Sequence, residues 1–253
     1  LISTSSANRK NKRVPMIIPE INHAHLKIIK NQQEYYDLPT SGFVCVKPNC
    51  SIQSYIFVID ALKKANFGVK KIQVTTLQAL SGAGYKALQN QNLKQNVIPY
   101  IENEEQKTEA EPLKIFGSIK KDSIINSSKI KISAICTRVP VIDGHTAIVS
   151  IGFKNKIPSR KKFKEILACY SSLPQTLKLP SAPLKPIHLI KDLDRPQPKM
   201  DINLDKGMAL SIGRIEKDPF LDIRFVGLSH NTLRGAAGGA ILNAELLIKE
   251  NYI

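Results

Sequence analysis

The spacing of apolar residues predicts a helix that begins directly after a cysteine. The stretch FVCV reads as a short strand over 43–46, and the Pro48-Asn49 pair after it predicts a turn. From residue 51 the apolar positions recur at helical spacing, in the order Ile52, Tyr55, Ile56, Ile59 and Leu62, and the pattern stops near 66–68. Cys50 therefore stands at the amino end of the predicted helix.

Similar patterns elsewhere predict further strands and helices. The strands are expected over 70–80, 130–141, 145–153, 208–215 and 221–229, and the helices over 159–171 and 232–250. The proline-rich stretch 173–198 reads as an extended surface crossing. Strand-like runs that alternate with helical ones are typical of a mixed α/β or α+β domain. We therefore expect a mixed, largely antiparallel sheet flanked by helices.

The last predicted helix contains three glycines in its first half. Gly235, Gly238 and Gly239 lower the helix propensity of this segment. Such glycines are usually compensated by a close approach of the helix backbone to a neighbouring group. We expect that approach here.

Length and composition favour a globular protein without a membrane segment. The chain has 253 residues, 42% of them hydrophobic, which allows one large domain or two small ones. It contains no uninterrupted apolar run of the roughly 18 residues that a membrane span needs, and the basic stretch at 9–13 is not followed by the apolar core of a signal peptide. These features predict a cytoplasmic protein with no membrane partner.

The net charge of +16 raises the question of nucleic-acid binding. Apart from RKNKR at 9–13 and SRKKFK at 159–164, the basic residues are scattered, and aromatic residues make up only 6%. This distribution favours a solvated basic surface over a nucleic-acid site. The four cysteines match no C-x2-C spacing, so we expect neither a metal site nor a disulfide framework.

Cys50 is a candidate nucleophile, because unpaired N–H groups at a helix start favour the thiolate; buried packing is the alternative. Arg138 ends one predicted strand and His145 begins the next, so a hairpin between them would point both side chains into one cleft. Taken singly, a histidine such as His145 is more often a structural residue at a strand end. Gln78 ends another strand, and Gly82 in the loop after it allows either a ligand or a tight turn.

Seven sequence blocks in order resemble one enzyme family. They are PNCS, VTTLQALSGAGY, NVIPYIENEEQKTEAEPLKI, RVPVIDGH, LPSAP, DRPQP and LSHNTLRGAAGGAILNAELL. The series is similar to aspartate-semialdehyde dehydrogenase in the branch shared by archaea, fungi and some bacteria, and it extends from about Ser5 to Ile253. The resemblance implies a catalytic domain like that of glyceraldehyde-3-phosphate dehydrogenase, with only remnants of a Rossmann domain.

The resemblance also implies a reaction and a cofactor. The family carries out the NADPH-dependent reductive dephosphorylation of β-aspartyl phosphate to aspartate β-semialdehyde, a step that feeds lysine, threonine, methionine and isoleucine synthesis. By analogy Cys50 attacks the acyl carbon and expels inorganic phosphate to give a thioester. Hydride from NADPH then gives a thiohemiacetal, which collapses to the aldehyde. His145 corresponds to the family's acid/base.

Further roles follow from the same resemblance. Arg138 matches the clamp on the substrate α-carboxylate, and Gln78 matches the residue that orients the substrate. Glu104 matches the group that receives the substrate amine, while Lys107 and Arg9 match phosphate-binding residues. The positions that match the nicotinamide side of the NADP site are Ser81, Gly82, Gly84 and Asn231.

The family's glycine-rich dinucleotide loop has no counterpart in this sequence. We therefore expect residues 1–44 to be the end of a truncated NADP-binding domain, 45–230 the catalytic and dimerisation domain, and 231–253 a helix that packs back on the NADP-binding domain. That helix is expected to be poorly supported, and the chain alone is expected to be inactive. Lys47 and Ile52 also stand where the family usually has other residues.

Two alternatives remain open at this point. One is a reductase of acyl-CoA thioesters, such as malonyl-CoA, with the same Cys-His pair. The other is a catalytically silent remnant that associates through its sheet. In either case a homodimer or homotetramer is expected.

Overall fold

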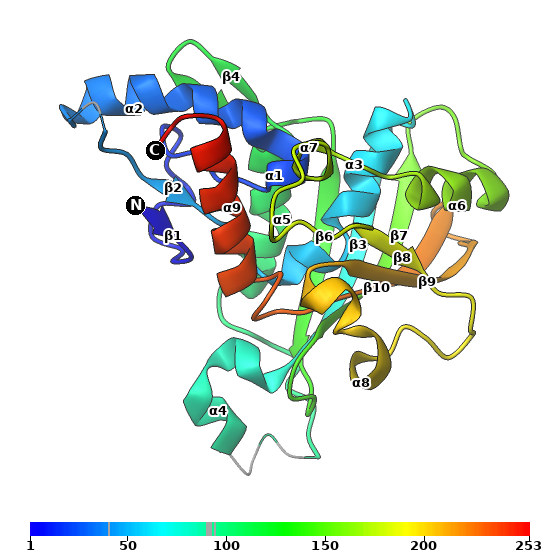
Figure 1. Cartoon of the computed structure of the whole chain (residues 1–253). Helices are drawn as coiled ribbons and strands as arrows, with labels where there is room; N and C mark the ends of the chain where they lie inside the picture. The colour runs from blue at the N-terminus through cyan, green and yellow to red at the C-terminus, as the bar shows by residue number, and fades with distance from the viewer. Residues whose placement is uncertain (40, 90–92, 94) are drawn as a thin grey trace.

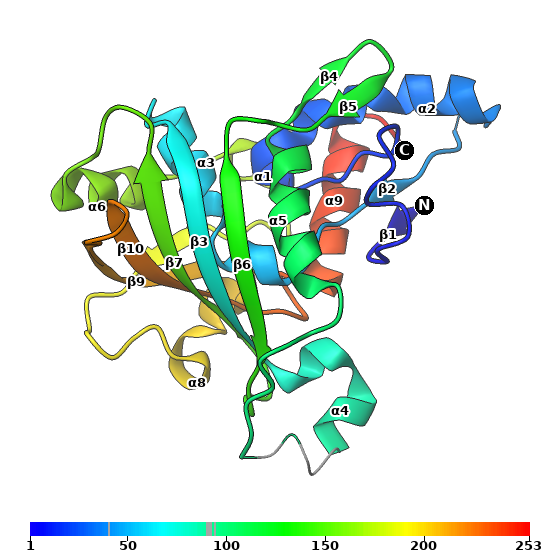
Figure 2. The same ribbon diagram turned by 180° about the vertical axis from the view of Figure 1, so that it is seen from behind.

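The computed structural model, which describes residues 1–39, 41–89, 93 and 95–253, is built around a six-stranded mixed sheet (Figure 1; Figure 2 from behind). In spatial order the strands are β6 (Lys131–Arg138), β3 (Val69–Gln78), β7 (His145–Phe153), β10 (Ile223–Ser229), β9 (Leu210–Lys217) and β8 (Ile187–Leu189). β3 is parallel to β6, and β8 is parallel to β9, whereas the remaining pairs of this sheet are antiparallel. The predicted sheet is confirmed.

Helices cover one face of the sheet. α3 (Ile56–Lys64), α5 (Glu104–Ile115) and α6 (Arg160–Ala168) share a hydrophobic core with the sheet residues that point toward them (Figure 2). The Ser159 Oγ accepts a hydrogen bond from the Lys162 N–H at 3.1 Å, as expected of the residue that opens α6. On the other face Ile135 and Ile148 are exposed. No helix among the described residues is long and apolar enough to cross a membrane.

The helix predicted after Cys50 is interrupted. A 3-10 turn, η2 (Ser51–Ser54), comes first, and Tyr55 then leaves the helical conformation with φ −146° before α3 begins. The helix dipole at Cys50 is that of a single short turn, because α3 begins six residues later. The expectation that a long helix would activate the thiol is therefore wrong.

The proline-rich stretch 173–198 is more structured than predicted. It contains α7 (Leu173–Thr176) and β8, and it leads into α8 (Pro198–Asp201) and η5 (Leu204–Gly207). β8 has only three residues and is held by pairing with β9, a partner distant in sequence. Local composition could not reveal that strand. A second unpredicted feature is the hairpin of β4 (Ser118–Lys120) and β5 (Ser123–Ile125).

The chain start forms a separate layer with the last helix. It comprises β1 (Ile2–Ser3), α1 (Pro19–Asn22), η1 (His23–Ile28), α2 (Ile29–Tyr36) and β2 (Cys45–Val46), with β1 parallel to β2. The last helix, α9 (Ala237–Lys249), packs against this layer (Figure 1). Two short elements, η3 (Leu80–Ala83) and α4 (Tyr85–Gln89), directly follow β3.

α9 is better packed than the sequence suggested. Leu242, Leu246 and Leu247 are each 1% exposed or less and share a core with Ile17 and Leu26. The expectation of a poorly supported helix is wrong for this face, because residues 1–46 cover it. Two residues of the opposite face, Ile241 and Ile248, are exposed. The helix also begins at 237 rather than 232, since the preceding residues form turns.

A buried ion pair fastens the turn before α9 to α1. The Arg234 Nη1 and Nη2 donate to the two carboxylate oxygens of Glu20, both at 2.7 Å, and the guanidinium lies 4.6 Å from the ring centre of Phe57. Both charged side chains are almost fully buried. Removing one member of such a pair leaves the other charge uncompensated.

We expect Glu20→Gln to lower the free energy of unfolding by about 3 kcal/mol, because an uncompensated guanidinium would stay buried. Denaturation in urea measures this change. The control is Glu216→Gln, which breaks the exposed pair of Arg160 and Glu216 and is expected to change stability little. Equal losses in the two variants would contradict the role given to the buried pair.

Candidate active site

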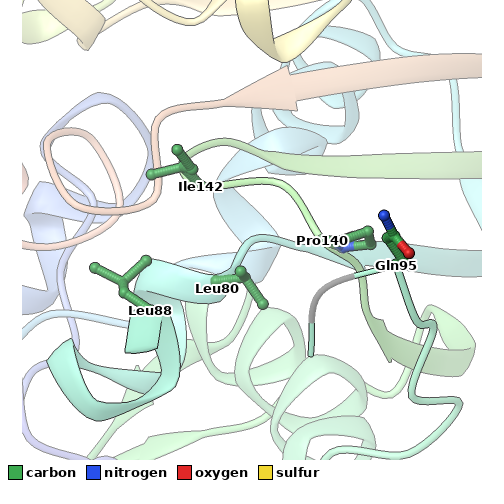
Figure 3. A pocket seen from close by; sticks show the side chains of 5 residues that line it. All are labelled: Leu80, Leu88, Gln95, Pro140 and Ile142. Atoms are coloured by element: carbon green, nitrogen blue, oxygen red, sulfur yellow. The ribbon is translucent and has the colours of Figure 1, made fainter. Parts of the chain in front are cut away.

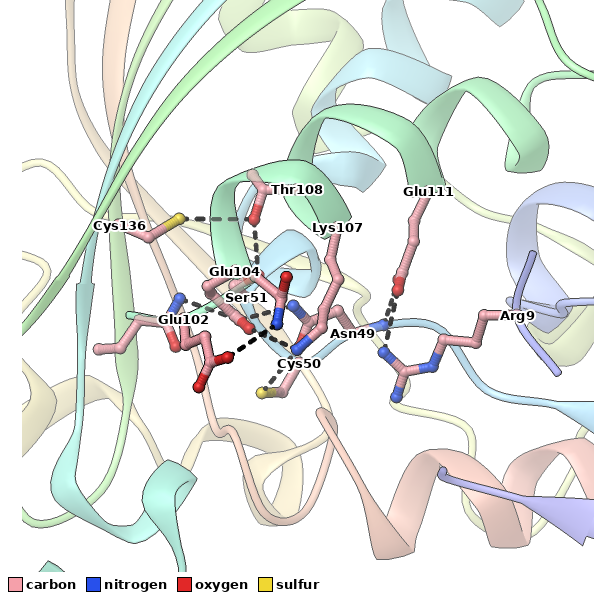
Figure 4. A network of polar contacts seen from close by, with 12 residues as sticks. Arg9, Asn49, Cys50, Ser51, Glu102, Glu104, Lys107, Thr108, Glu111 and Cys136 are labelled. Atoms are coloured by element: carbon pink, nitrogen blue, oxygen red, sulfur yellow. Dashed lines mark hydrogen bonds and ion pairs between the residues drawn. The ribbon is translucent and has the colours of Figure 1, made fainter. Parts of the chain in front are cut away.

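Cys50 lies in a loop whose backbone is fixed by α5. The Asn49 N–H donates to Glu111 Oε2 at 2.5 Å, and the Asn49 Nδ2 donates to Glu104 Oε1 at 2.6 Å. Figure 4 shows these contacts and the sulfur beside them. Cys50 is partly exposed, whereas Asn49 is buried. The loop therefore presents the thiol at the surface of a rigid polar network.

His145 is the first residue of β7, and its ring lies against the sulfur. The Cys50 Sγ and His145 Nε2 are 3.3 Å apart, and the Ala79 N–H donates to His145 Nδ1 at 3.1 Å. A backbone N–H is only a donor, so Nδ1 must be the acceptor and the proton of the neutral ring sits on Nε2. Burial and the nearby Arg138 lower the pKa of His145 to about 3. The ring is therefore neutral near pH 7 and offers its Nε2 proton to the sulfur.

The resting sulfur is a protonated thiol. Its second neighbour is Asn49 Oδ1, an acceptor at 3.4 Å, so the S–H points to Asn49 while the sulfur accepts from His145. Burial, followed by the Glu104 carboxylate, raises the pKa of Cys50 to about 11. Ionisation of this thiol needs additional positive charge nearby.

The hairpin expected between Arg138 and His145 does not exist, because β3 lies between β6 and β7. The two side chains meet through β3 instead. Arg138 Nη1 donates to the Ala79 carbonyl at 2.7 Å, and the Ala79 N–H donates to His145 Nδ1. The prediction that both side chains share one cleft is consistent with this arrangement, although its reason was wrong.

Glu104 is the centre of a polar cluster at the start of α5. Its Oε1 accepts from Asn49 Nδ2 and from Gln78 Nε2, the latter at 3.1 Å. Lys107 Nζ lies 3.3 Å from Glu104 Oε2, one turn along the helix. Gln78, at the end of β3, is thus oriented by Glu104 (Figure 4 labels Glu104 and Lys107). The structure brings Gln78, Glu104 and Lys107 together beside Cys50.

Arg9 lies at the other end of the same network. Its Nη1 is 2.9 Å from Glu111 Oε1, and its Nη2 donates to the Thr4 carbonyl at 2.6 Å. Arg9 and Lys107 therefore contact different carboxylates of α5, Glu111 and Glu104 respectively.

The loop after β3 forms the opposite wall of the site. Asn231 Nδ2 donates to Ser81 Oγ at 2.7 Å, and Asn231 Oδ1 accepts from the Gly144 N–H at 2.8 Å. A Cβ at Gly82 would lie 2.9 Å from His145 Cε1, so the imidazole needs a glycine there. Gly84 has φ +83°, and a Cβ there would meet no atom within 4 Å. The residues expected on the nicotinamide side thus border an open surface beside His145.

Sequence reasoning missed three residues that position this site, namely Asn49, Ala79 and Glu111. Glu111 had a detectable signal, because it follows Glu104 by seven residues and therefore lies on the same face of a helix. Asn49 had only its place next to Cys50. Ala79 acts through its backbone, which leaves no signal in the residue type.

A cavity of 570 Å³ lies next to the site and does not contain the sulfur. Figure 3 shows the side chains that line it, Leu80, Leu88, Gln95, Pro140 and Ile142. Leu80, which lines the cavity, directly precedes Ser81 and Gly82 of the wall opposite Cys50. Its apolar lining distinguishes it from the polar cluster around Glu104.

Comparison with known proteins agrees with this geometry. Residues 59–234 match the family model described as semialdehyde dehydrogenase, dimerisation domain. The chain is 41% identical to aspartate-semialdehyde dehydrogenase of Archaeoglobus fulgidus, over 99% of this chain and 70% of that protein. It is 40% identical to the Aspergillus fumigatus enzyme, over 100% of this chain and 71% of that protein.

A solved structure of an aspartate semialdehyde dehydrogenase is also similar to this chain. The crystal structure of aspartate semialdehyde dehydrogenase with NADP from Candida albicans is similar with a TM-score of 0.87 and 35% identity, over 100% of this chain and 72% of that chain. The fold and the family match thus define a semialdehyde dehydrogenase. More narrowly, the chain belongs to the aspartate-semialdehyde dehydrogenase family.

Proposed function

We propose that this chain carries the catalytic site for the NADPH-dependent reductive dephosphorylation of β-aspartyl phosphate to aspartate β-semialdehyde. The observation that carries the proposal is the 3.3 Å contact between Cys50 Sγ and the proton-bearing Nε2 of His145. A nucleophile and an acid that contact one another can act on the same carbonyl group. The reaction would supply aspartate-derived amino-acid synthesis, in the cytoplasm.

The charges around the sulfur suit an amino-acid substrate. Arg138 binds the Ala79 carbonyl through Nη1 only, and its Nε and Nη2 donate to none of the described residues. That edge is suited to a bidentate bond with the substrate α-carboxylate. Glu104 supplies the negative charge for the α-amine, with Gln78 beside it. Lys107 and Arg9 would bind the phosphate.

In the first step the thiolate of Cys50 attacks the acyl carbon of the substrate. The S–C bond forms, and the bond between the acyl carbon and the bridging phosphate oxygen breaks. Phosphate leaves with the electron pair of that bond. The Nε2–H of His145 donates a hydrogen bond to the acyl oxygen as negative charge develops there. In the later collapse of the thiohemiacetal, the hydroxyl proton goes to solvent and the oxygen forms the C=O bond of the aldehyde. The S–C bond breaks, and the sulfur leaves as a thiolate with the electrons of that bond.

The residues present fit one end of a dinucleotide. Gly84 leaves room for a flat ring, and Ser81 and Asn231 add polar groups at its edge, with Gly82 behind them. When bound, NADP supplies the hydride chemistry. The described residues include no glycine-rich loop for its pyrophosphate, so we propose that the 253-residue chain alone does not turn over. Residues 1–44 and 231–253 would then be the layer that joins the nucleotide-binding part to residues 45–230.

We also propose that the chain forms a homodimer, from which a tetramer could be built. The uncovered sheet face, with Ile135 of β6 and Ile148 of β7, is the surface that we assign to the dimer. The name of the matching family model supports this assignment.

The acyl-transfer half of the reaction tests the proposal without a dinucleotide. We expect freshly prepared β-aspartyl phosphate to add one aspartyl group to Cys50, detected by intact-protein and peptide mass spectrometry and removed by hydroxylamine. Malonyl-CoA is expected to give no adduct, since Glu104 and Arg138 together select a substrate with both an amine and a carboxylate. An adduct from malonyl-CoA would favour the acyl-CoA reductase alternative. No adduct from either reagent, with Cys50 still open to iodoacetamide, would favour the silent remnant.

A further inference from the structure

Lys47 is a buried lysine that the proposed reaction does not use. It precedes the Pro48-Asn49-Cys50 turn, and its N–H donates to the Ser3 carbonyl at 2.8 Å. A Cβ at Gly239 would lie 2.1 Å from Lys47 Cε, and a Cβ at Gly235 would lie 2.6 Å from Cys50 Cβ. The predicted close approach to these glycines is confirmed. It places the Lys47 side chain against Gly239 in the first turn of α9 and the Cys50 side chain against Gly235, four residues earlier.

The amine of Lys47 has no hydrogen-bond partner among the described residues. Lys47 is 3% exposed, and burying an ammonium without a partner is unfavourable by several kcal/mol. Burial, with the nearby Arg234, lowers the pKa of Lys47 to about 7, while an anionic Cys50 raises it. The charge on Lys47 is therefore coupled to the charge on the sulfur.

His145 cannot supply the cation that a Cys50 thiolate needs. A protonated imidazole carries a hydrogen on Nδ1, which would point directly at the Ala79 N–H. Arg9 is already paired with Glu111, and Arg138 is bound to the Ala79 carbonyl. The charged groups that face Lys47 or Cys50 are Arg9 from the chain start, Glu104 and Glu111 from α5, Arg138 from the end of β6, and Arg234 from the turn before α9. Glu104 opposes the thiolate, and among these cations, all of them described residues, Lys47 alone has a side chain without a hydrogen-bond partner.

We propose that Lys47 is a positioning residue whose ammonium stabilises the Cys50 thiolate. The inference rests on the proposed role of Cys50 as nucleophile, but it concerns only the ionisation of the thiol. When the proton leaves sulfur for solvent, the electron pair that remains lies beside the Lys47 charge. The two groups then compensate each other's burial. His145 is left to act on the substrate oxygen.

The pH dependence of Cys50 alkylation tests this assignment on the chain itself. Iodoacetamide reacts with the thiolate, forming the S–C bond and releasing iodide. Cys169→Ser is used as the background because Cys169 is exposed, and Cys50 modification is followed by peptide mass spectrometry. In Lys47→Met we expect the alkylation profile to move to higher pH and the rate at pH 7.5 to fall about tenfold, the effect of one nearby charge.

Two further variants make the result specific. Lys249→Met removes the same charge from the exposed end of α9 and is expected to leave the profile unchanged. Lys47→Arg keeps the charge at every pH. The pH midpoint of its Cys50 alkylation is therefore expected to equal that of the parent or to lie below it. This comparison decides the question even where Lys47→Met does not fold.

An unchanged profile in folded Lys47→Met, or a profile in Lys47→Arg that moves up in pH, would overturn the proposal. The readout is independent of the proposed function. If β-aspartyl phosphate fails to acylate the chain while Lys47→Met still shifts the alkylation profile, the proposed function fails and the role of Lys47 stands.

Discussion

Replacing Cys50 by serine is expected to abolish acylation by β-aspartyl phosphate, with a rate at least about four orders of magnitude below the parent rate. Serine fits the site and can keep both hydrogen bonds of the thiol, to Asn49 and from His145. Its hydroxyl ionises at far higher pH than a thiol, however, so the cation of Lys47 cannot make it anionic near pH 7. The change thus removes the nucleophile without removing the geometry.

Turnover is expected to disappear in parallel. It can be measured in a chimera that adds to this chain the part of the Archaeoglobus fulgidus relative outside the match, which covers 70% of that protein, by following phosphate-dependent NADPH formation from aspartate semialdehyde. Cys169→Ser is the matched control, because this cysteine is exposed and follows the last residue of α6. Cys50→Ser with more than about one hundredth of parent turnover would show that the sulfur is not the nucleophile.

Cys50 and His145, the two residues of the proposed acyl transfer, show how far local sequence patterns predict this site. The strand that begins at His145 was predicted with its observed bounds, 145–153, because its apolar residues alternate without interruption. Cys50 was located correctly between a turn and an apolar helix pattern, yet the helix itself breaks at Tyr55. Local patterns thus placed each residue in its element.

What brings the partners together is not local. β3 is inserted between β6 and β7, so the Ala79 peptide after β3 holds both Arg138 and His145. Strand order depends on contacts between segments about 60 residues apart or more, which no periodicity in one segment encodes. The tautomer of His145 follows from this contact alone, and no sequence pattern could have given it.

Lys47 shows a second limit. In the sequence it is one of 37 basic residues, and the charge pattern predicts a solvated surface. It is buried because Gly239 and the chain start close over its side chain. Burial of a charge is a property of packing between distant segments, so the sequence could not distinguish this lysine from the exposed ones.

Changing His145 is expected to lower turnover of the chimera by two to three orders of magnitude, the usual range for an acid that acts on the reacting oxygen. Two variants separate its two functions. In His145→Gln the amide nitrogen takes the place of Nε2 and still donates a hydrogen bond, whereas in His145→Asn only the position of Nδ1 is retained. Both variants lose the imidazole that Ala79 holds against the reacting oxygen, so turnover should fall in both. Acylation, which needs only the hydrogen bond, should fall less in His145→Gln than in His145→Asn.

The pH dependence of stability gives an independent check on the neutral ring. Burial and Arg138 lower the pKa of His145 to about 3, so between about pH 6.5 and pH 3 the unfolded chain binds a proton at this residue that the folded chain does not. Stability from this residue is therefore full above pH 6.5 and falls as the pH is lowered, by about 2 kcal/mol between pH 7 and pH 5. Urea denaturation at pH 7 and pH 5 measures this loss of unfolding free energy. The loss should be about 2 kcal/mol smaller in His145→Gln than in the parent. Equal losses in parent and variant would mean that folding does not lower the pKa of His145, which would contradict a buried ring that stays neutral.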